Sequence, residues 1–176
     1  LALPDHRPSS EIAVVVSSKQ AYHTDSYSPA NTVHSNIINH MIPKMFKAGA
    51  PIDIVDICDL PRLVTRGRHR QYKLFYFVNA FHLTGAERDL IDRHLKQDGR
   101  TLAFFFAPGY QGNPGAESER SLAGIEGVTG MRGVGKIDEL RLIGMTPNRE
   151  HPLLNKCEGA AFEARGWWGK EQLENY

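Results

Sequence analysis

The chain has 176 residues, and its 21 Lys and Arg against 20 Asp and Glu leave a formal net charge of +1. This balance provides no electrostatic field for a nucleic acid or an anionic membrane, so we expect neither as a partner. The two cysteines exclude a disulfide framework and are typical of a reducing compartment, which predicts a cytoplasmic protein. The length predicts one domain over 11–176, preceded by a linker or N-terminal extension at 1–10.

Four apolar runs rich in β-branched or aromatic residues predict buried strands. They cover 12–16, 52–57, 74–78 and 101–106. Continuous apolar strands are typical of a parallel sheet that is buried on both faces. Because helical patterns separate several of these runs, we expect an α/β fold, with a flavodoxin-like, doubly wound, mainly parallel sheet and helices on both faces.

Two helices are predicted between the strands. The first begins at Ser28-Pro29, an N-cap followed by a proline, and Pro43 should kink or restart it. The second begins at the capping box formed by Thr84 and Glu87.

Charged residues mark two further segments of this half. Arg88 is predicted on the solvated face of the second helix, opposite Leu90, Ile91 and Leu95. A basic loop is predicted from Arg62 to Lys73, which suits a solvated surface better than a phosphate grip.

The second half has a different composition, because only three of the 16 glycines precede residue 99. A loop is predicted at 111–115, a short helix at 118–122, and strands at 136–143 and 162–165. We therefore expect an irregular C-terminal part that is rich in loops and short strands.

Ligands of an open parallel sheet bind at the carboxyl ends of its strands. This rule selects the loops 17–28, 56–60, 79–82 and 107–111. If the chain is an enzyme, its candidate catalytic residues are Ser17, His82 and Tyr110. If it binds a small ligand such as a sugar, the candidate contacts are Ser18, Asn79, Gly109 and Trp167.

Motifs of other enzyme classes fail in their context. The segment 130–136 has the spacing of a phosphate loop, but Ile137 stands where magnesium binding requires Ser or Thr. The sequence contains no Gly-x-Ser-x-Gly elbow and no His-Glu-x-x-His. We therefore expect neither a metal nor a cofactor.

Two further features each leave two interpretations open. Asp56 and Asp59 could approach the ligand edge as a glycosidase pair, although Asp59 equally suits a turn. The adjacent Trp167 and Trp168 could stack on a sugar, but packing at an interface is the more common use of such residues.

The segment 71–110 contains Tyr-Lys-Leu before a strand, a charged helix followed by Asp98-Gly99, and a strand followed by Pro-Gly-Tyr110. This pattern resembles the glutamine-amidotransferase-like domain behind the catalytic barrel of bacterial β-galactosidases and related glycoside hydrolases, called the trimerisation domain in the former. The resemblance extends from about Glu11 to about Gly130 and is looser after Gly144.

In class I glutamine amidotransferases, a nucleophilic cysteine follows the strand that matches 101–106. Here Pro108-Gly109-Tyr110 stands in that place, so the resemblance implies no amidotransferase activity. The carboxylates of the glycosidase relatives belong to a barrel of about 250 residues, more than this chain can hold.

The resemblance therefore implies a non-catalytic accessory or oligomerisation module of a carbohydrate-active enzyme. Its expected partners are a second copy or a catalytic barrel domain, and also carbohydrate. A stand-alone hydrolase or transferase, and a small-ligand binding module, stay open as alternatives.

Overall fold

The structure is a computed structural model that describes residues 10–20, 37–105, 107–111 and 121–132. The chain divides into two compact units, Leu1–Gly135 and Lys136–Tyr176, and all described residues lie in the first. Most of the predicted linker, the start of the first helix at Ser28 and both late strands lie outside the described residues. The single domain over 11–176 stays a prediction.

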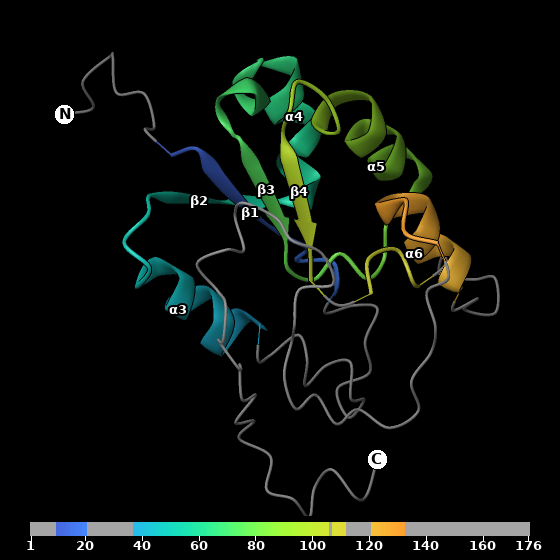
Figure 1. Cartoon of the computed structure of the whole chain (residues 1–176), viewed down its shortest axis with the longest axis horizontal. Helices are drawn as coiled ribbons and strands as arrows, with labels where there is room; N and C mark the ends of the chain where they lie inside the picture. Colours follow the sequence, from blue (N-terminus) through green and yellow to red (C-terminus); the bar gives the residue numbers. More distant parts are fainter. Residues whose placement is uncertain (1–9, 21–36, 106, 112–120, 133–176) are drawn as a thin grey trace, which may run out of the picture. The chain divides into compact units, whose positions relative to one another are not determined.

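Four parallel strands form one sheet in the order β2-β1-β3-β4 (Figure 1). They are β1 (Ile12–Val16), β2 (Ile52–Asp56), β3 (Leu74–Phe77) and β4 (Thr101–Phe104). In the register, Ile12 lies beside both Ile52 and Leu74. The four predicted strands and the α/β class are confirmed, although the last three strands end one or two residues before their predicted ends.

Helical segments connect the strands, and in several of them an α-helix directly adjoins a π-helical or 3-10 helical stretch. They are the π-helical η1 (Ile37–Met41), α3 (Ile42–Phe46), the 3-10 helices η2 (Ile57–Asp59) and η3 (Arg68–Gln71), α4 (Leu60–Thr65), α5 (Gly85–Leu90), the π-helical η4 (Ile91–Leu95) and α6 (Leu122–Thr129). Pro43 lies in the first turn of α3, so the predicted restart at this proline is confirmed.

Successive residues of β1 pack into two separate apolar clusters, because side chains alternate along a strand. Ala13 and Val15 pack in the larger cluster, which also receives buried side chains from β3, α4, η4 and α6. Val14 packs in the smaller cluster with Ile37 of η1 and Ile42 of α3. Burial of both sets explains why the sequence of β1 is apolar without interruption.

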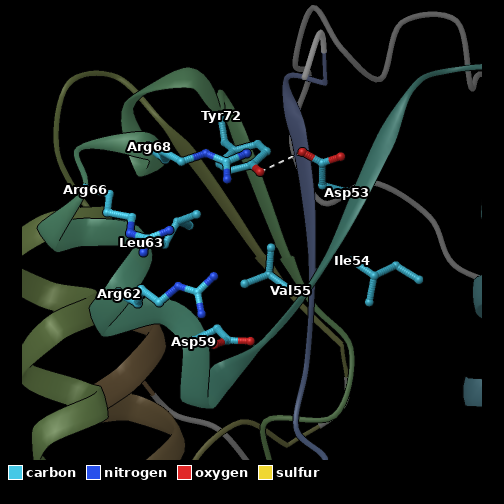
Figure 2. Close-up of a pocket in the computed structure, with 9 residues that line it drawn as sticks. All are labelled: Asp53, Ile54, Val55, Asp59, Arg62, Leu63, Arg66, Arg68 and Tyr72. Atoms are coloured by element: carbon cyan, nitrogen blue, oxygen red, sulfur yellow. Dashed lines mark hydrogen bonds between the residues drawn. The ribbon is translucent and has the colours of Figure 1, made fainter. Parts of the chain in front are cut away.

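The predicted loop from Arg62 to Lys73 is wrong, because most of this segment is helical. Pro61 lies in the first turn of α4, where a proline costs no helical hydrogen bond. Leu60 is 1% exposed and fixes α4 to the larger apolar cluster. Gly67 has a left-handed φ of +67°, which allows the chain to turn from α4 into η3 beside β2 (Figure 2).

Helix α6 has no counterpart among the predicted elements. The predicted helix at 118–122 falls mostly outside the described residues, and α6 begins at Leu122. Gly124 and Gly127 weaken the helical signal, whereas Ile125 and Val128 are buried and hold the helix by tertiary packing.

Candidate functional site

The carboxyl ends of β1 and β3 are joined by the side chain of Asn79. The backbone N–H of Ser17 donates to Asn79 Oδ1 at 2.7 Å, and Asn79 Nδ2 donates to the Ser17 carbonyl at 3.0 Å. Ser17 is 3% exposed and Asn79 is fully buried. The amide therefore continues the pairing of the two strands beyond their last backbone bonds.

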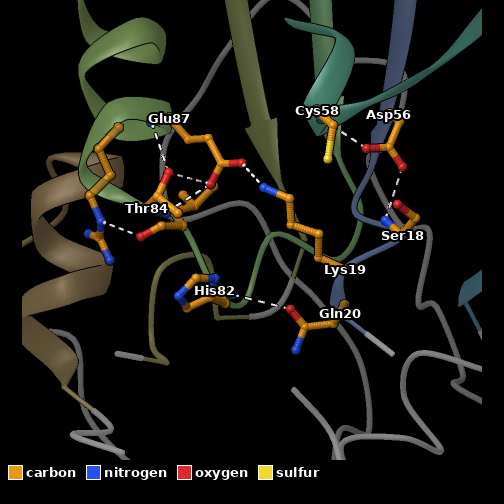
Figure 3. Close-up of polar contacts among 10 residues, drawn as sticks. Ser18, Lys19, Gln20, Asp56, Cys58, His82, Thr84 and Glu87 are labelled. Atoms are coloured by element: carbon orange, nitrogen blue, oxygen red, sulfur yellow. Dashed lines mark hydrogen bonds and ion pairs between the residues drawn. The ribbon is translucent and has the colours of Figure 1, made fainter. Parts of the chain in front are cut away.

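Gln20 connects the loop after β1 to two other loops at this edge. Its Nε2 donates to Gln111 Oε1 at 2.7 Å, and its Oε1 accepts from the His82 backbone N–H at 3.2 Å (Figure 3). His82 and Gln111 also form a parallel bridge beyond β3 and β4. Gln20 is fully buried and carries no motif, so only its place just after a buried strand could have indicated this role.

Asp56 organises the end of β2. Its two carboxylate oxygens accept the backbone N–H groups of Ser18 at 3.1 Å and Cys58 at 2.8 Å, and it caps η2 (Figure 3). Partial burial alone would raise the pKa of Asp56, but the hydrogen bonds from Ser18 and Cys58 outweigh it and lower the pKa. Burial and Asp56 raise the pKa of the exposed Cys58 thiol, which disfavours the nucleophilic thiolate.

The capping box of α5 also holds an ion pair. The predicted box is confirmed, since Glu87 N–H donates to Thr84 Oγ1 and Thr84 N–H donates to Glu87 Oε2. Lys19 Nζ lies 2.8 Å from Glu87 Oε1 and links the loop after β1 to α5 (Figure 3). Burial raises the pKa of Glu87, but the hydrogen bonds from Lys19 and Thr84 prevail and lower it.

Arg88 was predicted on the solvated face of its helix, and this prediction is wrong. Its guanidinium donates to the carbonyls of Leu83 at 3.2 Å, Gly124 at 3.0 Å and Gly109 at 2.9 Å. These bonds tie α5 to α6 and to the loop after β4. The three acceptors are backbone carbonyls from three separate segments, and the five N–H donors of a guanidinium allow one side chain to bond to all of them.

Gly109 fits its position because it has no side chain. Its φ is +69°, and an added Cβ would lie 2.9 Å from both Arg88 Nη2 and Val128 Cγ2. Its N–H donates to the Ala80 carbonyl at 2.8 Å. The loop that follows β4 is therefore packed against the loop after β3 and against α5 and α6.

The structure thus brings most of the predicted site residues to one edge of the sheet. Ser17, Asn79 and His82 are buried, Gly109 packs under Arg88, and Tyr110 accepts from the Ser121 N–H through its carbonyl at 2.9 Å. Ser18 contributes its backbone N–H, and Trp167 lies outside the described residues. The contacts described above join the loops to one another, whereas the catalytic and ligand-binding roles of these residues stay predictions.

The described ranges also bear on metal binding and on membrane insertion. No group of three or more His, Cys, Asp and Glu there is placed to hold a metal ion. No helix in the described part of the chain has the length and apolar character needed to cross a membrane.

A second polar region lies beside α4 and η3. A pocket of about 260 Å³ opens between β2 and the segment formed by α4 and η3 (Figure 2). Its lining combines carboxylates, guanidinium groups, apolar side chains and one phenol. The lining residues are Asp53, Ile54, Val55, Asp59, Arg62, Leu63, Arg66, Arg68 and Tyr72.

Comparison with known proteins adds no assignment. No protein-family model, no curated protein and no solved structure matches this chain. The resemblance to the module of the β-galactosidases therefore stays a prediction, and function is argued from the residues and their geometry.

Proposed function

We propose that this chain is a non-catalytic accessory module of a carbohydrate-active enzyme, and that it mediates association with a second copy or with a catalytic barrel. One observation carries the non-catalytic part. The resemblance places Pro108-Gly109-Tyr110 where the amidotransferases hold their cysteine, and the space above Gly109 is filled by Arg88 and Val128. None of these three residues is a cysteine, and Gly109 has no room for a side chain.

The proposed fold is the flavodoxin-like, doubly wound arrangement. The order β2-β1-β3-β4 with all strands parallel supports it, because the chain moves outward from β1 in both directions. The two apolar clusters on alternate residues of β1 also support it, since each cluster receives helical side chains from different segments. We also propose a cytoplasmic location, because a chain with only two cysteines has no disulfide framework.

The association surface that we propose is the β2 side of the sheet. Among the described strands, β2 is the last on this side, and such an edge offers backbone groups to another chain. Ile54 in the middle of β2 is 47% exposed, and Phe46 at the end of α3 is 54% exposed. Large exposed apolar side chains near a sheet edge are typical of protein contacts.

Sedimentation velocity over a range of protein concentrations tests the self-association. We expect the wild-type chain to form a discrete oligomer and Ile54→Lys to be monomeric, because a charge at the edge opposes strand pairing. Met131→Lys is the matched control, since Met131 is apolar and 66% exposed but lies beyond α6, and it should leave the oligomer intact.

A strict monomer at every concentration would contradict self-association and leave the barrel as the proposed partner. A natural reading frame that encodes a barrel in the same protein would support that partner. A saturable hydrolase or transferase activity lost in His82→Ala, with the fold retained, would overturn the non-catalytic proposal.

A further inference from the structure

We propose that the pocket between β2 and α4 binds a small phosphate monoester, an interaction that goes beyond association. The argument rests on the convergence of three arginines in one small cavity (Figure 2). Of the loops at the carboxyl edge, only 56–60 reaches this pocket, through Asp59, and none of the predicted site residues lines it.

The backbone explains how three guanidinium groups reach one cavity. Arg62 lies in the last turn of α4 and Arg66 is its C-cap residue, four positions later, so the two side chains lie on the same side of the helix end. Gly67 then turns the chain through a left-handed conformation, and Arg68 begins η3 above the same cavity. In Figure 2 all three side chains come from the α4 and η3 wall, whereas Asp53 comes from the β2 wall.

The three arginines make no ion pair with a carboxylate within the described part of the chain. The ion pairs found there involve Lys19, Lys73, Arg93, Lys96 and Arg100 instead. Three exposed like charges around one cavity repel each other and raise the local concentration of anions. A bound anion would reduce that repulsion and would accept charge-assisted hydrogen bonds from the guanidinium groups.

The opposite wall presents a fixed carboxylate. The Tyr72 hydroxyl donates to Asp53 Oδ2 at 2.7 Å, and Tyr72 is 2% exposed (Figure 2). Burial and then Asp53 raise the pKa of Tyr72 to about 12, so the phenol keeps its proton at neutral pH and continues to donate. Asp53 is therefore oriented, and its other oxygen can accept from a hydroxyl group of a ligand.

The chemistry of the two walls selects the class of ligand. A single guanidinium satisfies a carboxylate with two parallel bonds, whereas the three terminal oxygens of a phosphate can engage several guanidinium groups. The carboxylates of Asp53 and Asp59 suit the hydroxyl groups of the esterified alcohol. A cavity of about 260 Å³ is smaller than typical drug-sized pockets, so the alcohol part must be small.

Isothermal titration of the full chain with glycerol 3-phosphate tests the proposal, with glycerol and acetate as comparison ligands at the same ionic strength. We expect saturable binding of the phosphate ester and much weaker or no binding of glycerol and acetate. Arg68→Gln and Arg66→Gln should each weaken the binding of the ester by about tenfold or more, because each removes a charge-assisted contact.

Arg70→Gln is the matched control, because Arg70 is exposed in the same helix η3 but does not line the pocket. It should leave the affinity within about twofold of the wild type. Equal losses in Arg70→Gln and Arg68→Gln would show general charge attraction and overturn the site. Equal binding of acetate and the ester would overturn the phosphate class, and absence of saturable binding in the millimolar range would overturn the pocket as a ligand site.

Discussion

The carboxyl edge of the sheet and the pocket beside β2 are both polar, but their polar groups are satisfied in different ways. At the carboxyl edge, the side chains of Asn79, Gln20 and Arg88 bond to backbone or side-chain groups of neighbouring loops. In the pocket, Arg62, Arg66 and Arg68 have no carboxylate partner within the described residues.

This difference separates polar groups that hold the fold from polar groups that are available to a ligand. A buried donor or acceptor that loses its partner lowers the free energy of unfolding. An exposed cation is solvated by water, so it needs no protein partner to be tolerated in the folded state. Substitutions at the carboxyl edge should therefore reduce stability, and substitutions in the pocket should reduce binding. The following experiments test that separation in order of decreasing effect.

The largest effect is expected at Gly124, where α6 lies against the loop after β4. An added Cβ would collide with the Gly109 carbonyl oxygen, and neither backbone can move freely. Gly124→Ala should lower the free energy of unfolding by about 3 kcal/mol in urea denaturation. Gly127→Ala in the same helix meets nothing within 4 Å, and it should raise stability by about 1 kcal/mol through helix propensity. Equal effects of the two substitutions would show that α6 does not pack as described.

The next effect is expected at Asn79. Asn79→Ala removes both bonds to the Ser17 backbone and leaves a buried N–H and C=O without those partners, which should cost about 2 kcal/mol. Gln97→Ala is the control, because the Gln97 side chain is exposed in the turn after η4, and it should change stability by less than about 0.5 kcal/mol. Thermal and urea unfolding measure both. An unchanged stability in Asn79→Ala would mean that this amide is held for a ligand rather than for the fold.

A smaller, pH-dependent effect is expected for the pair Lys19 and Glu87. The folded pKa of Glu87 lies below its ordinary value of 4.5, so its ionised form contributes stability above that pH, and the contribution is lost as the pH falls through the folded pKa. Glu87→Gln keeps the capping box but removes the charge, so it should cost about 1 kcal/mol or less at pH 7 and flatten the acid limb of the stability profile.

The same pair allows a direct test of coupling. Adding Lys19→Met to Glu87→Gln should change stability little further, because the partner of the lysine is already neutral. Urea midpoints measured from pH 7 into the acid range give the profile for each variant. Full additivity of the two substitutions would show that the ion pair contributes nothing to the fold.

The smallest effect on stability is expected in the pocket. Arg68→Gln should change the free energy of unfolding by less than about 0.5 kcal/mol in phosphate-free buffer, with Arg70→Gln as its neighbour control. Its effect should appear only when a phosphate ester is present and stabilises the wild type by mass action. A loss well above 1 kcal/mol without ligand would place Arg68 among the residues that hold the fold, and the contrast between the regions would disappear.

Local patterns were sufficient to predict the four strands, the start of α5 and the restart at Pro43. The run Ile12–Val16 is apolar without interruption because its alternate side chains enter two different clusters. Thr84 and Glu87 satisfy each other within one turn, so their spacing alone indicates the start of α5. Pro43 likewise acts within its own helix.

Tertiary contacts decided the features that patterns did not predict. Arg88 resembles any surface charge on a helix, and two of its three carbonyl partners, Gly109 and Gly124, lie far along the chain. The segment after Pro61 was predicted as a loop because its many charges mask Leu60, whose burial holds α4 in place. Ser17 and Asn79 meet at the carboxyl edge because parallel strands end together, whereas the catalytic and binding roles of this edge stay predictions.

The sequence separations of these contacts have a consequence for folding kinetics. Bonds at the carboxyl edge join residues that are 62 apart between Ser17 and Asn79 and 91 apart between Gln20 and Gln111. Such contacts must wait until long loops have closed and β1, β3 and β4 are aligned. The arginines of the pocket, by contrast, are brought together within the single segment 62–68. The cationic wall can therefore form early and locally, whereas the carboxyl edge closes as a late step of folding.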